Sequence, residues 1–155
     1  MGKIISLEEI QKEISSNDTV ILTGGCFDII HPGHIQFLSA AKKLGGTLLV
    51  LLESDQTVSR LKGPDKPIHS QEQRAFILSH LTPVDIVVPI PPLHTDKAYE
   101  DVITAISPAV IAVTKGDAYV DIKKSHAKKV GAQIVEVMER DGEHASSKIA
   151  SRLNV

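Results

Sequence analysis

The feature that most constrains the fold is a regular alternation of two apolar patterns along the chain. Short, unbroken apolar runs rich in β-branched residues are separated by segments in which apolar residues recur at helical spacing. We expect strands at 20–23, 47–52, 84–90, 110–114 and 133–137, and helices at 7–14, 33–44, 54–60, 71–81, 96–106, 122–130 and 146–153. Strands without polar alternation are typical of a parallel sheet covered on both faces. The sequence therefore predicts an α/β fold with a doubly wound, five-stranded parallel sheet.

Several of the expected helices have recognisable ends. Ser6 followed by Glu9, and Ser70 followed by Gln73, match the capping box that closes a helix N-terminus. A chain of 155 residues with 42% hydrophobic content is long enough for one buried core. We expect a single domain over 1–155, in which 1–17 form an N-terminal helix and lead-in.

Composition excludes several classes of partner. The 17 basic and 19 acidic residues nearly cancel, so the chain lacks the basic excess that holds a nucleic-acid backbone. The longest apolar run, Leu48–Leu52, is far shorter than a membrane span. Cys26 is the single cysteine, and the first thirty residues do not resemble a secretory signal. We expect a cytoplasmic protein with neither nucleic acid nor membrane as partner.

The first long apolar run leads directly into a glycine-rich turn, Gly24-Gly25-Cys26-Phe27-Asp28-Ile29-Ile30-His31-Pro32-Gly33-His34. In doubly wound sheets, ligands bind beyond the carboxyl ends of the strands, where helix N-termini present unpaired N–H groups. Adjacent glycines let such groups approach a phosphate. Two imidazoles beside them can donate hydrogen bonds to an α-phosphate as its charge grows in the transition state. The turn predicts a phosphate site, although it matches neither the dinucleotide nor the Walker pattern.

Two other interpretations of the turn stay open. Histidines three residues apart are, in an arbitrary sequence, most often an internally satisfied pair. Cys26, Asp28, His31 and His34 are also residue types that bind zinc. Their position after the first strand of an α/β sheet favours the phosphate site over both.

The turn resembles the signature of the HxGH cytidylyltransferase-like nucleotidyltransferase superfamily, in which a glycine-rich G-x-F-D turn precedes H-x-G-H. The similarity covers about residues 18–153 and continues at Arg60-Leu61-Lys62-Gly63, at 67–74, at Lys115-Gly116-Asp117 and at Ser146-Ser147-Lys148-Ile149. The resemblance implies a Rossmann-like fold. It also implies transfer of a nucleoside monophosphate from an NTP to a phosphorylated small molecule, with release of pyrophosphate. Mg²⁺ would enter with ATP or CTP rather than on a metal site of the protein, and a homodimer is expected.

The resemblance also implies roles for individual residues. His31, His34 and Lys62 would be catalytic, with Lys62 in a loop from which its ammonium reaches a bound triphosphate. Nucleotide binding would involve Gly24, Gly25, Cys26, Phe27, Lys115, Gly116, Asp117, Arg140, Ser146 and Ser147. Asp28 and Arg74 would belong to the substrate site, although we expect Asp28 to order the turn rather than to react. For Arg74, a surface ion pair with Glu72 or Asp85 is the alternative to binding the acceptor's phosphate. Lys62 could equally be a solvated lysine, and Ser146 and Ser147 could simply be helix caps.

Within the superfamily, the similarity is greatest to the adenylyltransferase halves of ADP-heptose synthases. That group usually has one more glycine in the segment matching Lys115–Tyr119, and threonines rather than Ser146-Ser147. Those segments would contact the base and the acceptor. The favoured function is D-glycero-β-D-manno-heptose 1-phosphate adenylyltransferase, and the alternatives are a glycerol-3-phosphate cytidylyltransferase and an FMN adenylyltransferase. A non-catalytic nucleotide-binding module is a further alternative.

Overall fold

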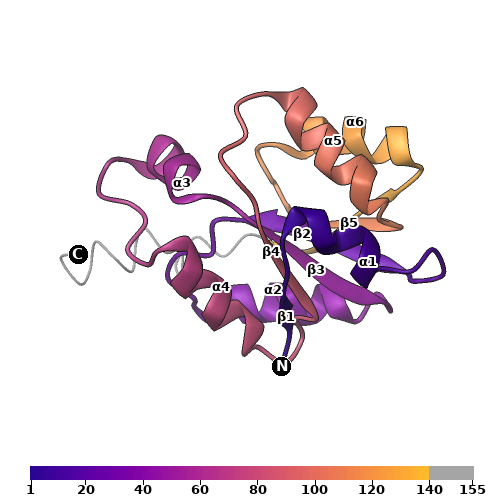
Figure 1. Cartoon of the computed structure of the whole chain (residues 1–155), viewed down its shortest axis with the longest axis horizontal. Helices are drawn as coiled ribbons and strands as arrows, with labels where there is room; N and C mark the ends of the chain where they lie inside the picture. The colour runs from indigo at the N-terminus through magenta and orange to yellow at the C-terminus, as the bar shows by residue number, and fades with distance from the viewer. Residues whose placement is uncertain (140–155) are drawn as a thin grey trace.

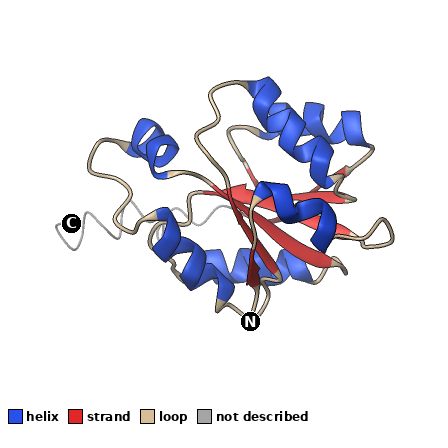
Figure 2. Ribbon diagram, viewed as in Figure 1, coloured by secondary structure: helices blue, strands red, loops and turns tan. Residues whose placement is uncertain are grey.

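The computed structural model describes residues 1–139. Strands alternate with helices along the chain (Figures 1 and 2). The strands are β1 (Lys3–Ile4), β2 (Val20–Gly25), β3 (Thr47–Leu52), β4 (Ile86–Pro89), β5 (Val110–Lys115) and β6 (Gln133–Glu139). The helices are the 3-10 helix η1 (Leu7–Glu9), α1 (Ile10–Glu13), α2 (Pro32–Lys42), α3 (Asp55–Lys62), α4 (Gln71–Ser79), α5 (Asp96–Ile106) and α6 (Val120–Val130).

All of these strands are parallel and belong to one sheet in the order β1-β4-β3-β2-β5-β6. Strand β2 lies at its centre, with β3 on one side and β5 on the other. The strand order therefore changes direction at β2, and such a switch point opens a crevice beyond the carboxyl ends of the strands. The predicted doubly wound parallel sheet is confirmed, with one strand more than the five expected. The extra strand, β1, adds two exposed residues to the edge beside β4.

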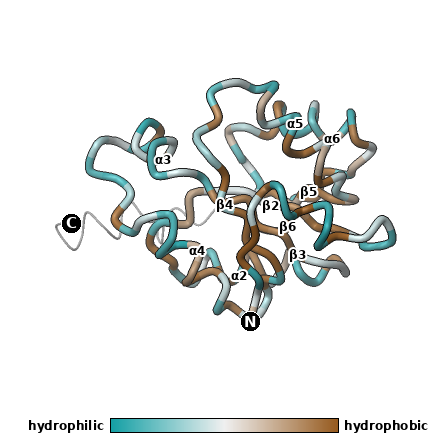
Figure 3. Tube along the Cα trace, viewed as in Figure 1, coloured by the Kyte–Doolittle hydropathy of each residue, from teal (hydrophilic) through white to brown (hydrophobic). Residues whose placement is uncertain are grey.

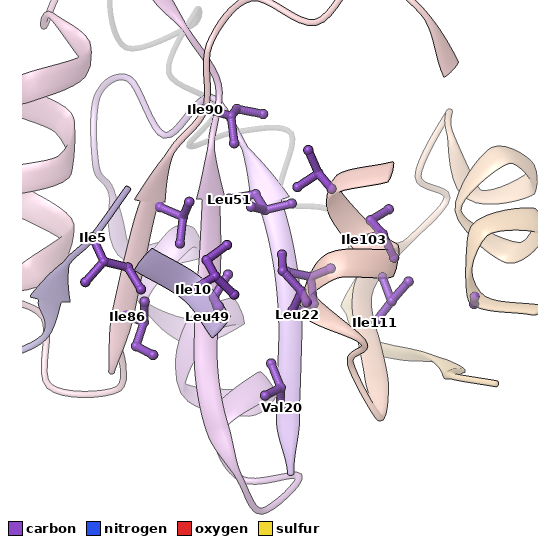
Figure 4. Packing of buried hydrophobic residues seen from close by; sticks show 14 of the residues in the cluster. Ile5, Ile10, Val20, Leu22, Leu49, Leu51, Ile86, Ile90, Ile103 and Ile111 are labelled. Atoms are coloured by element: carbon purple, nitrogen blue, oxygen red, sulfur yellow. The ribbon is translucent and has the colours of Figure 1, made fainter. Parts of the chain in front are cut away.

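Two apolar clusters hold the helices to opposite faces of the sheet. Alternate residues of β3 divide between them: Leu49 and Leu51 face α1, α5 and α6, whereas Leu48, Val50 and Leu52 face α2 and α4. Figure 4 shows the first cluster, and Figure 3 shows how apolar residues concentrate along the strands. Each fully buried leucine or isoleucine stabilises the fold by roughly 1.5–3 kcal/mol. Helix α3 contributes to neither cluster and lies beyond the sheet (Figure 1).

The helix ends follow the sequence signals in most places. Both predicted capping boxes are present, at Ser6 with Glu9 and at Ser70 with Gln73. The prediction that Lys62 lies in a loop is wrong, because α3 continues through Lys62 and the loop begins at Gly63. The helix predicted at 146–153 lies outside the described residues. Within residues 1–139, no helix has the length and apolar character needed to cross a bilayer.

Candidate active site

The phosphate turn predicted from the sequence lies at the centre of the sheet edge. Gly24 and Gly25 end β2, and the chain then turns back into α2. Phe27 adopts a φ of 46°, in the left-handed region that side chains other than glycine rarely occupy. Its ring lies so close to Gly25 that a Cβ there would come within 3.0 Å of a ring carbon. A larger residue at this position would force the ring of Phe27 to shift, and the strained backbone of Phe27 is a common mark of functional sites.

His31 and His34 form a capping box at the start of α2. The backbone N–H of Gly33 donates to Nδ1 of His31 at 3.1 Å, and the backbone N–H of His31 donates to Nδ1 of His34 at 3.3 Å. A ring nitrogen that accepts a hydrogen bond carries no proton, so a neutral ring carries its proton on Nε2. The local fold therefore sets the same tautomer in both histidines and makes each Nε2 a donor.

His34 is neutral at physiological pH. Burial lowers the pKa of its imidazole to about 4, and the positive charges of His31 and Lys62 act in the same direction. The two imidazole rings stack with their centroids 3.8 Å apart. The arrangement supplies a pair of adjacent hydrogen-bond donors, of which His34 is uncharged at neutral pH.

A cavity of about 230 Å³ opens beside these rings, and we call it the nucleotide cavity. Its walls combine residues of the turn, α2, β5 and the end of α3, and include Gly24, Gly25, Cys26, Phe27, His31, His34, Lys62 and Asp117. The ammonium of Lys62 is exposed and makes no ion pair or hydrogen bond within residues 1–139. Asp117 accepts hydrogen bonds from the backbone N–H of Tyr119 and from Lys123. These eight site residues predicted from the sequence therefore meet around one cavity.

Other predicted residues do not line this cavity. Lys115 ends β5 and Gly116 follows it, next to Asp117, but neither residue lines the nucleotide cavity. Gly116 has a φ of +79°, which explains why the turn uses glycine. Arg140, Ser146 and Ser147 lie outside the described residues. Met138, in β6, lines the cavity two positions before Arg140.

Cys26 contributes its backbone rather than a reactive thiol. Burial raises the pKa of the thiol, and the carboxylates of Glu53 and Asp28 raise it further, against the opposing charges of Lys62 and Arg74. The side chain therefore stays protonated at neutral pH.

Arg74 has a different role from either one suggested by the sequence. Its side chain is completely buried. The guanidinium donates to the carbonyl oxygens of Cys26 at 2.6 Å and His69 at 3.0 Å, and to Oδ1 of Asp55 at 2.7 Å. It therefore joins the phosphate turn to α3 and to the segment before α4. The guanidinium has no exposed surface with which to reach an acceptor, and its ion pair is with neither Glu72 nor Asp85.

Asp28 also acts within the scaffold. Its carboxylate is buried and accepts hydrogen bonds from the backbone N–H groups of Ile68 at 2.8 Å and His69 at 2.9 Å, which orders the turn. It does not line the nucleotide cavity, and its role in the substrate site stays a prediction. Among residues 1–139, no group of three histidine, cysteine, aspartate or glutamate side chains is arranged to hold a metal ion. Because Asp28 is committed to this backbone, the zinc interpretation of the turn loses one of its four ligands.

A second cavity, of about 390 Å³, lies on the other side of the turn, and we call it the lateral cavity. It shares residues 23–26, Ala112 and Lys123 with the nucleotide cavity. Sequence reasoning assigned no role to several of its polar residues, among them Glu53, His94, Thr95, Asp96, Tyr99 and His126. A signal existed for Glu53, because a charged residue directly after a buried strand marks the ligand edge of the sheet.

Comparisons with known proteins agree with this architecture. The cytidylyltransferase-like family model matches residues 22–151. The bifunctional protein HldE of Wolinella succinogenes is 43% identical over 121 residues, which cover 76% of this chain and 24% of that protein. HldE of Pseudomonas entomophila is 36% identical over 137 residues, which cover 86% of this chain and 27% of that protein. This chain spans about a quarter of the length of these curated relatives.

Solved structures share the fold. The lipopolysaccharide core biosynthesis protein of Thermoplasma volcanium superposes with a TM-score of 0.65 at 26% identity, covering 81% of this chain and 100% of that chain. A pantoate-beta-alanine ligase from Francisella tularensis has the same TM-score of 0.65 at only 15% identity, over 92% of this chain and 69% of that one, and shows the fold alone. Because the family model covers most of the sequence, the chain belongs to the cytidylyltransferase-like family of nucleotidyltransferases.

Proposed function

We propose that this chain transfers AMP from ATP to D-glycero-β-D-manno-heptose 1-phosphate and releases pyrophosphate. The observation on which the proposal rests is the pair of Nε2 donors of His31 and His34 beside a glycine turn at the switch point of the sheet. The similarity to HldE proteins supports a sugar phosphate as acceptor. ATP is the favoured nucleotide because the sequence resembles the adenylyltransferase group.

The reaction is an in-line displacement at the α-phosphorus of the nucleotide. An oxygen of the acceptor's phosphate forms the new P–O bond while the bond to the β-phosphate breaks, and pyrophosphate leaves. A phosphate monoester is already an anion at neutral pH, so the attack needs no general base. Mg²⁺ carried by the triphosphate would neutralise part of its charge.

The residues of the nucleotide cavity have complementary tasks in this step. The Nε2 donors of His31 and His34 stabilise the charge that develops on the α-phosphoryl oxygens. Backbone N–H groups of residues 24–27 bind the same group, and the unpaired ammonium of Lys62 binds the β- and γ-phosphates. Asp117 binds the ribose or base with Lys115 and Gly116 nearby. Arg140, Ser146 and Ser147 would complete the triphosphate site.

The two cavities suit a reaction with two substrates. Both are lined by residues 23–26, so an α-phosphate bound at the turn would have one cavity on each side. In-line displacement requires the attacking oxygen to approach opposite the leaving group. We therefore assign the nucleotide to the nucleotide cavity and the acceptor to the lateral cavity.

Pyrophosphate release tests the proposal directly. ATP and CTP are each combined with heptose 1-phosphate, glycerol 3-phosphate and FMN, and His34→Ala serves as the blank. We expect turnover with ATP and heptose 1-phosphate that is lost in the blank. Turnover with CTP and glycerol 3-phosphate, or with ATP and FMN, would replace the acceptor assigned here. No turnover despite ATP-dependent thermal stabilisation would favour a nucleotide-binding module.

A further inference from the structure

Glu53 lies in the wall of the lateral cavity, next to the phosphate turn. It follows β3 directly, and its backbone N–H donates to the carbonyl oxygen of Gly25 at 3.1 Å. The residue is thereby tied to the last glycine of the phosphate turn. Its side chain lines the lateral cavity and not the nucleotide cavity. A ligand that fills the lateral cavity up to the turn therefore lies close to Glu53.

The carboxylate of Glu53 can accept more hydrogen bonds than it does within residues 1–139. The hydroxyl of Tyr99, on α5, lies 3.1 Å from Oε1 and 3.0 Å from Oε2 of Glu53. One hydroxyl has one proton, whereas a carboxylate has about four lone-pair sites. Within residues 1–139, Tyr99 is the hydrogen-bond partner of this carboxylate, and no second one is present. Burial raises the pKa of Glu53, which shows that the group is only partly solvated. Further donors would therefore be bound favourably here.

The surrounding charges indicate what kind of donor fits. Arg60 and Lys123 line the same cavity, and their positive charges favour the ionised form of Glu53. An ionised carboxylate accepts hydrogen bonds from hydroxyl groups and repels phosphates. The cavity therefore suits an acceptor with one phosphate, directed at the turn, and with hydroxyl groups close to that phosphate.

Much of the remaining wall of the cavity is apolar. It includes Leu22, Leu51, Ile90, Leu93, Ile103 and Ile111. Figure 4 shows Leu51, Ile90 and Ile103 on one face of the sheet, toward the ends of the strands that lead to the turn. Such a wall can contact the carbon atoms of a sugar ring while polar groups opposite bind its hydroxyls. The combination fits a cyclic polyol monophosphate better than a linear, highly charged acceptor.

We propose that Glu53 is a specificity-determining residue, whose carboxylate accepts a hydrogen bond from a hydroxyl of the acceptor next to its phosphate. Tyr99 is a positioning residue that holds this carboxylate in place. The inference rests on the proposed function, and it adds the residues that select the acceptor.

Steady-state kinetics of the full chain test the inference. Glu53→Gln keeps the shape of the side chain and removes its charge, and Tyr99→Phe removes only the hydroxyl. The exposed Glu72→Gln on α4 is the matched control. Because a charged acceptor becomes a neutral amide oxygen, the hydrogen bond is weakened, and we expect Glu53→Gln to raise the KM for heptose 1-phosphate by about 10-fold and to leave the KM for ATP unchanged. Tyr99→Phe should raise the same KM by less.

A second acceptor distinguishes recognition of a hydroxyl from a general loss of structure. Wild type should prefer heptose 1-phosphate to its 2-deoxy analogue, and Glu53→Gln should lose most of this preference. An unchanged preference and acceptor KM in Glu53→Gln, with wild type active, would overturn this inference alone. A rise in both substrate KM values would also overturn it, because that result indicates a structural role. Absence of pyrophosphate release by wild type would overturn the proposed function, and this inference with it.

Discussion

The imidazole rings of His31 and His34 stack at 3.8 Å with an interplanar angle of 27°, and both rings use Nδ1 to accept a backbone N–H at the start of α2. One short segment thus performs two tasks. It caps a helix, and through the two Nδ1 acceptors it orients two Nε2 donors. The geometry of the proposed catalytic pair is therefore linked to the same hydrogen bonds that start the helix.

His34 should make stability depend on pH. Its pKa in the folded protein is about 4, below the ordinary 6.5, so the unfolded chain binds more protons between these values. Stability from this group is fully present above pH 6.5 and is lost as pH falls toward 4. We expect the urea midpoint of wild type to fall more between pH 7 and pH 5 than that of His34→Gln. Equal falls in the two proteins would contradict the lowered pKa.

Arg74 should matter for folding before it matters for binding. Arg74→Met leaves the carbonyl oxygens of Cys26 and His69 without their donor, so we expect a loss of about 3 kcal/mol in the free energy of unfolding. Arg74→Lys keeps the positive charge, but an ammonium cannot reach Cys26, His69 and Asp55 in the planar geometry of the guanidinium. Its stability should therefore lie between that of Arg74→Met and that of wild type. Urea unfolding measures both. A variant with wild-type stability and a raised acceptor KM would instead indicate that Arg74 binds substrate.

Replacing Lys62 should impair the reaction with ATP and leave stability almost unchanged, which is the opposite of the effect expected for Arg74. Its ammonium is exposed and unpaired within the described residues, so Lys62→Ala should change stability by no more than about 0.5 kcal/mol. Loss of a charged contact to the triphosphate should lower kcat/KM for ATP by about 10-fold to 100-fold. Lys43→Ala, an exposed lysine at the end of α2, is the control. If both alanine variants have the same kcat/KM as wild type, Lys62 is only a solvated lysine.

The sequence predicted local features well. The strand at 47–52 and the helix at 96–106 have the expected bounds, because each has a strong apolar pattern of its own. The glycine-rich turn lies between the first long strand and the helix that follows it, as expected, because it is a contiguous segment. In contrast, β1 has no pattern of its own and exists because Lys3 and Ile4 pair with Ile86 and Val87.

The contacts that the sequence could not predict join residues distant along the chain. Arg74 was correctly placed on a helix, but its burial depends on Cys26 and Asp55, which only the folded chain brings together. Glu53 and Tyr99 meet in the same way, because β3 ends and α5 begins beside the same cavity. The homodimer and the roles of Arg140, Ser146 and Ser147 stay predictions.

The most direct test of the central claim is the rate of pyrophosphate release by His34→Ala compared with wild type. His34 is chosen rather than the N-cap His31, because the capping hydrogen bond that His34 accepts, at 3.3 Å, is longer than the one that His31 accepts, at 3.1 Å, so its loss should destabilise α2 less. Loss of one preorganised donor should lower kcat by about 10²-fold to 10³-fold, while thermal stabilisation by ATP persists. Wild-type turnover by His34→Ala would contradict the assignment of the turn as the catalytic site.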